Sequence, residues 1–366
     1  MKICSPQLGI SPESSLGGEI YDYQTLKGFT KKGISVFVYL PKNRTYDKSL
    51  KKFHVEYCFM THIIPPWIYS FICLPYLFRT YKKEKFDILR IHSPRYLGIA
   101  GIIFHTFYQT PIIVSAVTPQ PSKYLFWIEK YLYKISSKII VQSYYMKKQL
   151  ATSFKIPINK IEVTYGGVDT VSSKIKKSQT PNLFEKDDVL LVYMGLINKR
   201  KNPRFLLKVI KKVINEFPKL KLVIIGQGEQ KKDIKNDVKK MRLEKNVIFI
   251  DKAYGEDKIF WLSKMDIFLM PSLDEGLGLA LVEAMSFGKT ALVSDIEPFR
   301  EVIDNEMDGY IAPLKVDIWV NKTITLIKNR KLRENIGNRA KEKVNSIFSW
   351  GKMYDQNAII CQKLIK

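Results

Sequence analysis

Short apolar runs that alternate with helical patterns constrain the fold of this chain more than any other feature of its sequence. In the first half of the chain the apolar runs are Ser35–Leu40, Ile88–Ile91, Ile112–Ala116 and Lys138–Val141, and the helical patterns are Glu19–Lys32, Lys123–Ser136 and Tyr144–Ser153. Continuous apolar runs are typical of strands that are buried on both faces. Strands that alternate with helices form a parallel sheet. The pattern therefore predicts a parallel sheet with helices on both faces.

The same alternation restarts after a polar stretch, Thr170–Asp188. The later apolar runs are Val189–Met194, Leu220–Ile225, Val247–Ile250, Ile267–Met270, Ala291–Ser294 and Tyr310–Ala312. A helix is expected over Pro203–Glu216, because proline is favoured in the first turn of a helix. A chain of 366 residues is long for one domain and sufficient for two of about 150–200 residues each. We therefore predict two α/β domains joined near residues 170–188.

The net charge of +25, from 60 basic and 35 acidic residues, favours an anionic partner. Nucleic acid, a membrane surface and a phosphorylated small molecule all meet this condition. Lysine accounts for 49 of the basic residues and arginine for 11, whereas specific reading of nucleic acid depends largely on arginine. We therefore expect no specific nucleic-acid partner. Residues 1–180 hold 26 basic and 10 acidic groups, which makes the N-terminal half the better candidate to face an acidic partner.

The four cysteines, Cys4, Cys58, Cys73 and Cys361, lie far apart and none has a histidine at metal-ligand spacing. Neither a zinc site nor a disulfide framework is expected, and a reducing compartment is the default for such a chain. The segment Met1–Pro6 has one charge and lacks the apolar core of a signal peptide. Together these features predict a cytoplasmic protein.

Two stretches, Tyr57–Phe78 and Tyr96–Ser122, contain no Asp, Glu, Lys or Arg. Their prolines argue against a membrane-spanning helix and favour buried pieces of helix, loop and strand. Residues 63–78 are also rich in aromatic side chains and run directly into a basic segment, residues 79–85. Apolar side chains flanked by basic ones are typical of binding at a membrane interface. Contact of residues 63–85 with an anionic membrane surface, on the cytoplasmic face, is therefore the alternative to burial in the core.

The segment Pro271–Met285 carries the most specific chemistry. It follows an apolar run that ends at Met270 and leads through a glycine-bearing turn into a helix. The first turn of a helix has backbone N–H groups beside the positive end of the helix dipole, which suits a phosphate. Glu275 in the turn and Glu283 on the helix add carboxylates, and a carboxylate accepts hydrogen bonds from two vicinal hydroxyl groups. The arrangement favours a sugar-nucleotide site, with a chance pairing of carboxylates as the alternative.

At this segment the sequence resembles the retaining glycosyltransferases of family 4, which have the GT-B fold. Their C-terminal pattern of Pro-Ser, Glu-Gly, Gly-Leu, Glu-Ala-Met and a further glycine recurs from Pro271 to Gly288. Further matches follow in order along the chain: Gly17-Gly18-Glu19, Phe86-Asp87-Ile88, Ser143, Gly166-Gly167-Val168-Asp169, Gly226-Gln227-Gly228, Asn246-Val247, Asp308-Gly309 and Phe348-Ser349-Trp350. Ordered agreement over nearly the whole chain is more specific than a single glycine loop.

The resemblance implies two Rossmann-like domains that face each other across a cleft, with a C-terminal helix that crosses back to the first domain. The expected division is 1–170 for the acceptor-side domain, 171–188 for a linker, 189–348 for the domain that binds the nucleotide sugar and 349–366 for the returning helix. The implied reaction moves a sugar from a UDP- or GDP-linked donor to a saccharide or lipid-linked acceptor, with retention at the anomeric carbon. GT-B enzymes hold the diphosphate without a metal, so neither a metal nor a cofactor is expected.

The resemblance also implies roles for residues of the C-terminal domain. Glu283 would bind the ribose hydroxyls of the donor, and Glu275 would hold hydroxyls of the transferred sugar. The backbone of Gly278 and Leu279 would touch the sugar and the β-phosphate.

Lys201, six positions after Gly195, corresponds to the family's diphosphate-binding lysine, which offsets charge on the leaving group. An ordinary surface lysine is the alternative. The family usually has an arginine directly after this glycine, and here the position holds Leu196. Lys199 or Arg200 is the candidate to supply the missing charge.

In the N-terminal domain the resemblance assigns Gly17 and Gly18 to the approach of backbone amides to the diphosphate, with a purely structural glycine pair as the alternative. The family usually has a histidine near the reacting sugar, at the position where this chain has Val117. His92 and His105 are the nearest candidates to replace it. His92 is favoured because it ends a predicted strand, and a structural histidine is the alternative.

Two other classes of function stay open. One is a GT-B nucleotide-sugar epimerase or hydrolase, which would act without an acceptor. The other is a non-catalytic basic protein that binds nucleotides or nucleic acid. Intact Glu275, Lys201 and Glu283 argue against a non-catalytic protein, and the sequence gives no positive sign of an epimerase or hydrolase. No residue distinguishes UDP- from GDP-linked donors.

Overall fold

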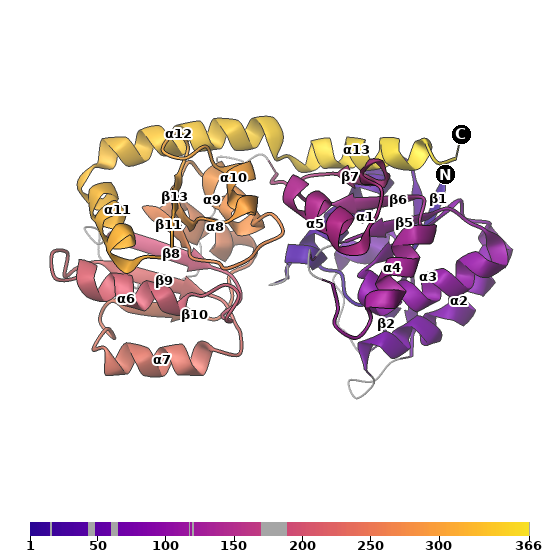
Figure 1. Ribbon diagram of the computed structural model, residues 1–366, viewed down its shortest axis with the longest axis horizontal. Helices are drawn as coiled ribbons and strands as arrows, with labels where there is room; N and C mark the ends of the chain where they lie inside the picture. Colours follow the sequence, from indigo (N-terminus) through magenta and orange to yellow (C-terminus); the bar gives the residue numbers. More distant parts are fainter. Residues whose placement is uncertain are drawn as a thin grey trace. The chain divides into compact units, whose positions relative to one another are not determined.

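The chain forms two compact units. The computed structural model describes residues 1–14, 17–42, 48–59, 65–116, 118, 121–169 and 189–365. One unit comprises Met1–Gly166 and Trp350–Lys366, and the other comprises Gly167–Ser349. Figure 1 shows both units, with labels on helices and strands where there is room. The predicted linker, 171–188, lies outside the described residues.

The N-terminal unit contains a seven-stranded sheet in which neighbouring strands are parallel. In spatial order its strands are β3 (His54–Cys58), β2 (Ser35–Pro41), β1 (Lys2–Pro6), β4 (Ile88–His92), β5 (Ile112–Ser115), β6 (Lys138–Val141) and β7 (Ile161–Val163). Four of them, β2, β4, β5 and β6, coincide with predicted apolar runs. The pattern did not predict β1, β3 and β7, because each carries polar residues such as Ser5, Glu56 and Glu162.

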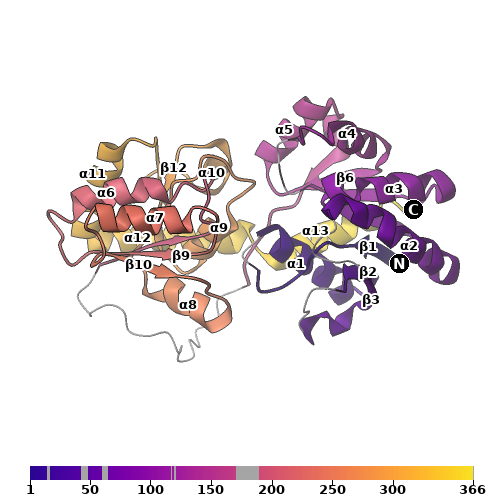
Figure 2. The ribbon, with the colours of Figure 1, turned by 90° about the horizontal axis from the view of Figure 1, so that it is seen from below.

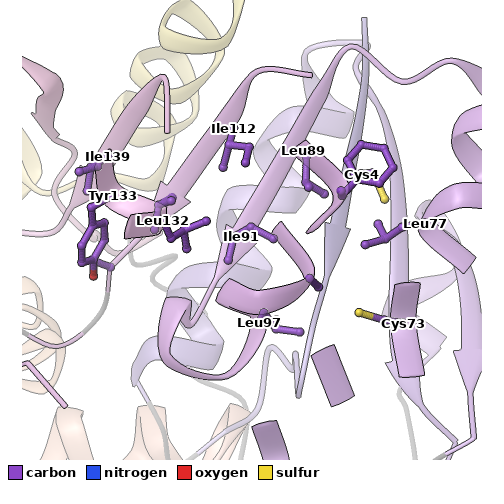
Figure 3. Packing of buried hydrophobic residues seen from close by; sticks show 14 of the residues in the cluster. Cys4, Cys73, Leu77, Leu89, Ile91, Leu97, Ile112, Leu132, Tyr133 and Ile139 are labelled. Carbon is purple, nitrogen blue, oxygen red and sulfur yellow. The ribbon is translucent and has the colours of Figure 1, made fainter. Parts of the chain in front are cut away.

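Helices cover both faces of this sheet (Figure 1). Helices α2 (Tyr69–Glu84), α3 (Pro94–Tyr108), α4 (Phe126–Ile135) and α5 (Tyr144–Phe154) pack on one face, and α1 (Gly17–Lys31) and α13 (Trp350–Gln362) pack on the other. Successive strand residues point to opposite faces, so Leu89 and Ile112 enter the first core and Ile88 and Ile113 the second. Figure 3 shows Leu89 and Ile112 in the first core, packed with side chains from α2, α3 and α4.

Helix α13 packs closely against α1, although more than 300 residues separate them in the chain. A Cβ atom on Gly28 would lie 2.4 Å from the ring of Tyr354, so the absence of a side chain at position 28 allows the contact. The Tyr354 hydroxyl donates to Gln24 Oε1 at 2.5 Å, and Lys32 forms an ion pair with Asp355. These contacts join the C-terminal helix to the N-terminal unit.

The two stretches without charged residues supply helices and core strands of the N-terminal unit. Cys73, Leu77 and Phe104 from these stretches are buried. The expectation that proline would interrupt the first stretch is wrong at Pro75, which lies inside α2. Pro75 is exposed, so water can solvate the backbone carbonyl that loses its helical partner. Within the described part of the chain, no helix is long and apolar enough to span a membrane.

The C-terminal unit contains a six-stranded parallel sheet. In spatial order its strands are β10 (Val247–Ile250), β9 (Lys221–Ile225), β8 (Leu190–Met194), β11 (Ile267–Met270), β12 (Thr290–Ser294) and β13 (Tyr310–Ala312). Its helices are α6 (Arg204–Val213), α7 (Lys231–Lys240), α8 (Gly255–Lys264), α9 (Leu279–Ser286), α10 (Glu297–Val302), α11 (Val316–Lys328) and α12 (Arg330–Ile347). Every one of these strands was predicted as an apolar run.

Both sheets reverse their direction of growth at one internal position. In the N-terminal unit the chain builds β1, β2 and β3 outward and then returns to place β4 beside β1. In the C-terminal unit it builds β8, β9 and β10 and then places β11 beside β8. Ligands of open α/β sheets bind at such a switch point, beyond the carboxyl ends of the two central strands. The topology therefore predicts ligand sites at the carboxyl ends of β1 and β4 in one unit and of β8 and β11 in the other.

Candidate active site

In the C-terminal unit, the loops that follow β8 and β11 are bonded to each other. The Leu273 amide donates to the Arg200 carbonyl at 2.8 Å, and the Asn202 side chain donates to the Pro271 carbonyl at 3.2 Å. Arg200 Nη1 donates to the Asp274 carbonyl at 2.8 Å. Because β8 and β11 are parallel neighbours, their carboxyl ends meet at the same edge and bring the loops together. The switch point is thus occupied by one joined pair of loops.

Glu275 lies at the centre of these loops and is 4% exposed. Lys201 forms an ion pair with Glu275 Oε1, and the Ser272 hydroxyl donates to the same oxygen at 2.9 Å. Arg200 Nη1 lies 3.4 Å from Glu275 Oε2. The structure therefore brings together three predicted site residues, Glu275, Lys201 and Arg200. A buried carboxylate with two cations suits a ligand that combines hydroxyl groups with negative charge.

The end of β8 packs closely against the loop after β9. A Cβ atom on Gly226 would lie 1.9 Å from the Gly195 carbonyl oxygen, and one on Gly228 would lie 2.2 Å from the Ile197 carbonyl oxygen. Leu196, at the position of the family's arginine, offers its backbone carbonyl to the Tyr193 hydroxyl at 2.6 Å. Burial and the nearby Glu275 carboxylate both raise the pKa of the Tyr193 phenol, so it stays a neutral donor.

Gly278 and Leu279 mark the start of α9. Gly278 precedes the helix with φ of +92°, and a Cβ atom there would lie 2.8 Å from the Phe299 ring. Both the positive φ and the short approach require glycine. Glu283 lies in the second turn of α9 and forms an ion pair with Lys258 of α8, at 2.5 Å. The Glu283 side chain is 22% exposed and has a different cation partner from Glu275.

In the N-terminal unit, the switch point contains a buried ionic cluster. Gly17 and Gly18 open α1, and Asp22 follows on the same helix. Asp22 forms an ion pair with Arg90 of β4, and its Oδ1 lies 3.0 Å from Nδ1 of His92, the last residue of β4. Asp22 is fully buried and Arg90 is 1% exposed. The cluster therefore holds His92 at the carboxyl end of β4.

Opposing effects act on the pKa of Asp22. Burial raises it, but the nearby Arg90 guanidinium and His92 ring outweigh burial and lower the pKa to about 2. Asp22 is therefore a carboxylate, which accepts hydrogen bonds and does not donate them. With its Oδ1 3.0 Å from His92 Nδ1, the carboxylate is placed to accept a hydrogen bond from that nitrogen.

The other residues considered for the missing histidine are placed differently. His105 lies in the last turn of α3, with Nδ1 3.0 Å from the Thr110 carbonyl oxygen. This position is near the start of β5, at the edge of the sheet opposite His92. Val117 lies outside the described residues, and Lys199 is exposed.

Four residues of these clusters were not anticipated: Asp22, Arg90, Ser272 and Lys258. Arg90 was the available signal, because an arginine inside the apolar run Ile88–Ile91 requires a buried anionic partner. Nothing in the local sequence identifies Asp22 as that partner. In the portion of the chain that is described, no group of three or more His, Cys, Asp and Glu residues is arranged to hold a metal ion.

Comparisons with known proteins identify both halves of the chain. Residues 174–343 match the family model described as Glycosyl transferases group 1. Residues 17–172 match the model described as Glycosyltransferase Family 4. The chain is 28% identical over 274 residues to UDP-Gal:alpha-D-GlcNAc-diphosphoundecaprenol alpha-1,3-galactosyltransferase of Escherichia coli, with 70% of each chain covered. It is 25% identical over 288 residues to sulfoquinovosyl transferase SQD2 of Arabidopsis thaliana, with 73% of this chain and 55% of the relative covered.

A solved structure shares the fold. The crystal structure of Anabaena HepE in complex with UDP and glucose has a TM-score of 0.81 and 16% identity, with 99% of each chain covered. The predicted GT-B class, with two Rossmann-like parallel sheets, is confirmed by this likeness.

Proposed function

Because the chain belongs to the glycosyl transferases of group 1, with an N-terminal half of the Glycosyltransferase Family 4 type, we propose that it transfers a sugar from a nucleoside-diphosphate sugar to a saccharide or lipid-linked acceptor. The donor is UDP- or GDP-linked, the anomeric configuration is retained, and no metal ion takes part. The observation that carries the proposal is the set of contacts of Lys201 and Arg200 with Glu275 at the switch point of the C-terminal unit.

The proposed reaction requires positive charge near the leaving diphosphate. The bond from the anomeric carbon to the diphosphate oxygen breaks, and the acceptor oxygen forms a new bond to that carbon on the same face. The acceptor hydroxyl gives its proton to an oxygen of the departing diphosphate. The leaving nucleoside diphosphate takes the bonding electrons, so negative charge grows on its phosphates. Lys201 and Arg200 are assigned to this charge. The Lys201 side chain is 14% exposed, and charge interactions are stronger in such a partly buried place than in water.

The proposal gives the two glutamates different partners. Glu275 is held by Ser272, Lys201 and Arg200, and a carboxylate fixed in this way suits adjacent hydroxyl groups of the transferred sugar. Glu283 is assigned to the ribose hydroxyls, with Lys258 holding its carboxylate. The α9 amides that follow Gly278 are assigned to the β-phosphate.

Residues of the N-terminal unit complete the assignment. Gly17 and Gly18, at the start of α1, are assigned to the approach of the diphosphate. His92 is assigned to the transferred sugar, where its Nε2 accepts a hydrogen bond from a hydroxyl group. The ion pair between Asp22 and Arg90 supports this assignment, because it fixes the ring that would otherwise rotate.

The proposed acceptor is a saccharide that takes part in glycan assembly at the cytoplasmic face of a membrane. The Escherichia coli relative is named for an acceptor linked to diphosphoundecaprenol, which supports a lipid-linked saccharide. Trp67 and Phe71, within the segment 63–85 for which we predicted membrane contact, are 44% and 47% exposed, and residues 63 and 64 lie outside the described residues. All four cysteines are free and buried, in agreement with a reducing compartment.

Thermal-shift binding tests the donor site. The protein is titrated with UDP, GDP and ADP and with their common sugar conjugates, as wild type, as Glu283→Ala and as Glu244→Ala. Glu244 is an exposed residue that precedes β10, at the opposite edge of the sheet, and serves as the matched control. A ligand at a hundred times its dissociation constant adds roughly 2.7 kcal/mol to the free energy of unfolding. We expect a shift with one nucleotide that Glu283→Ala loses and Glu244→Ala keeps. An equal shift in all three proteins would contradict the assignment of Glu283.

A second measurement separates the transferase from an epimerase or hydrolase of the same fold. Nucleotide release from the donor is followed with and without candidate lipid-linked and free saccharide acceptors. A transferase releases nucleotide much faster when a competent acceptor is present. Equal release without any acceptor, or recovery of an isomerised donor, would refute the transfer reaction.

A further inference from the structure

Helix α4 carries aromatic side chains that face solvent. Tyr124, in the turn before the helix, is 93% exposed, Trp127 is 74% exposed and Tyr131 is 52% exposed. Trp127 and Tyr131 are four residues apart and therefore lie on the same side of the helix. We call these three residues the α4 aromatic face.

The α4 aromatic face does not contribute to the core. The opposite side of the helix makes the core contacts, with Leu132 and Tyr133 buried against the sheet. Glu129 also points inward, where its carboxylate lies 3.4 Å from Arg95 and accepts the Ser122 amide at 2.8 Å. Large aromatic residues are normally mostly buried, so a group of exposed ones indicates a surface that another body covers.

Lysines surround the α4 aromatic face. Lys130 Nζ lies 5.3 Å from the centroid of the Trp127 ring, and Lys123 and Lys134 are exposed nearby on the same segment. The acidic residue of α4 is the buried Glu129, which leaves the outer side of the helix positively charged. Aromatic rings beside lysine ammonium groups match the headgroup region of a bilayer that contains anionic lipids.

Helix α2 offers a poorer match, although its sequence led to the membrane prediction. Trp67 precedes α2 and Phe71 lies in its first turn, whereas the basic residues of 79–85 lie in the second half of the helix or directly after it. Because a helix rises 1.5 Å per residue, Phe71 and Lys83 are separated by about 18 Å along the helix axis. Arg79, which lies between them, is engaged by Glu56. The helix therefore separates the exposed aromatic residues Trp67 and Phe71 from the lysines near its end.

The position of α4 connects this surface to the candidate site of the N-terminal unit. Figures 1 and 2 both show α3 between α2 and α4. Arg95, in the first turn of α3, contacts Glu129 of α4, and α3 starts two residues after His92. The start of α4 is thus at the same edge of the sheet as His92, since both follow the carboxyl ends of parallel strands.

We propose that the α4 aromatic face, with Lys123, Lys130 and Lys134, docks the protein on an anionic lipid bilayer. Trp and Tyr rings insert at the level of the headgroups, and the lysines attract the anionic lipids. The proposal rests on the proposed function in one respect: a lipid-linked acceptor lies in a membrane, so the enzyme must reach the membrane surface to use it. Docking itself requires neither donor nor acceptor, so it is measured without them.

Vesicle co-sedimentation tests the proposal on the full chain. Vesicles of phosphatidylcholine alone are compared with vesicles that also contain phosphatidylglycerol. We expect the wild type to bind the anionic vesicles, and the combined variant Tyr124→Ser/Trp127→Ser/Tyr131→Ser to bind about tenfold more weakly or worse. Lys123→Gln/Lys130→Gln/Lys134→Gln should lose the preference for anionic lipid. The double variant Phe107→Ser/Ile158→Ser, at exposed apolar positions on α3 and in the turn before β7, is the matched control and should bind as the wild type does.

Each other outcome overturns the proposal in an identifiable way. Unchanged binding by the aromatic variant would remove α4 as the docking surface. Loss of binding in Trp67→Ser/Phe71→Ser, with binding retained in the α4 variant, would transfer the function to α2. A wild-type dimer that the α4 variant converts to a monomer, without vesicle binding by either, would show that a second copy covers the face. Hydrogen exchange of peptides from β4 and α3, measured in every variant, confirms that the N-terminal unit is folded and requires neither donor nor acceptor.

Discussion

Replacement of Asp22 with asparagine is expected to destabilise the N-terminal unit by about 2–4 kcal/mol. The substitution keeps the shape of the side chain and removes its charge. Arg90 is 1% exposed, and its guanidinium remains protonated in any protein environment. The variant would therefore hold an uncompensated positive charge inside the core.

The magnitude follows from the partners of Arg90. Its guanidinium lies 3.4 Å from the Ser5 hydroxyl and 3.1 Å from the Ser115 hydroxyl, and both groups remain in the variant but carry no charge. Removing one member of a buried ion pair costs about 3–5 kcal/mol. The asparagine oxygen recovers about 1 kcal/mol by accepting a hydrogen bond. The difference gives the expected range.

Hydrogen exchange followed by mass spectrometry is the suitable assay, because two units need not unfold as one and a single unfolding free energy is then undefined. Peptides from α1 and β4 should exchange about 30-fold faster or more, since about 1.4 kcal/mol corresponds to a factor of ten. Peptides from β8 and β11 should be unchanged and serve as an internal reference. Asp355→Asn, which breaks the exposed ion pair with Lys32, is the matched control and should cost less than about 1 kcal/mol.

A change below about 1 kcal/mol in α1 and β4 would refute this reasoning, because it would mean that the Arg90 charge is compensated without Asp22. The double variant Asp22→Asn/Arg90→Met provides a further check. Removing both charges should be less destabilising than removing Asp22 alone.

The remaining predictions concern pH, the leaving group, a turn and metals. The folded-state pKa of Asp22 lies at about 2, below its ordinary value of 3.8. The ionised carboxylate therefore adds about 2 kcal/mol to the free energy of unfolding above pH 4, and this stabilisation is lost as the pH falls from about 4 to 2. Denaturation midpoints of the wild type should show this loss, and those of Asp22→Asn should not. Lys201→Met should lower kcat by about 100-fold or more while donor binding by thermal shift persists, and unchanged turnover would exclude Lys201 from the leaving-group role. Gly278→Ala should destabilise the C-terminal unit by about 1–3 kcal/mol in urea unfolding, because position 278 has φ of +92° and faces Phe299 at 2.8 Å. Turnover should be the same with and without a chelator, and a loss that Mg²⁺ or Mn²⁺ restores would contradict metal independence.

Much of the fold could be predicted because buried parallel strands leave a local signature. The strands β2, β4, β5, β6 and β8 to β13 are mainly apolar runs, and each was recognised without knowledge of its neighbours. The edge strand β3 was missed, because most of its residues are at least partly exposed and its sequence alternates polar and apolar residues such as His54 and Val55. Strand β1 was missed for a different reason: Ser5 and Arg90 form a hydrogen-bonded pair within the core, so polarity there does not indicate exposure.

The candidate site also has residues that the sequence identifies and residues that only the fold brings to them. The motif from Pro271 to Gly288 identifies Glu275, Gly278 and Glu283 from sequence, because a strand, a turn and a helix N-terminus are contiguous in the chain. The partners of these residues are not contiguous. Lys201 and Glu275 are 74 residues apart, and their contact depends on β11 returning to lie beside β8.

The sequence by itself determined the two α/β units, most of their strands and the motif that belongs to the glycosyl transferases of group 1. These properties depend on local patterns of apolar residues, glycines and carboxylates, which act over a few residues. Only the tertiary structure decided that Asp22 neutralises Arg90 and orients His92, that Lys258 meets Glu283, and that α4 rather than α2 combines exposed aromatic rings with lysines. Such contacts depend on strand order and on which side of a helix faces solvent. Both are set by the packing of the whole unit, because burial of the apolar surfaces stabilises one arrangement and brings distant residues together.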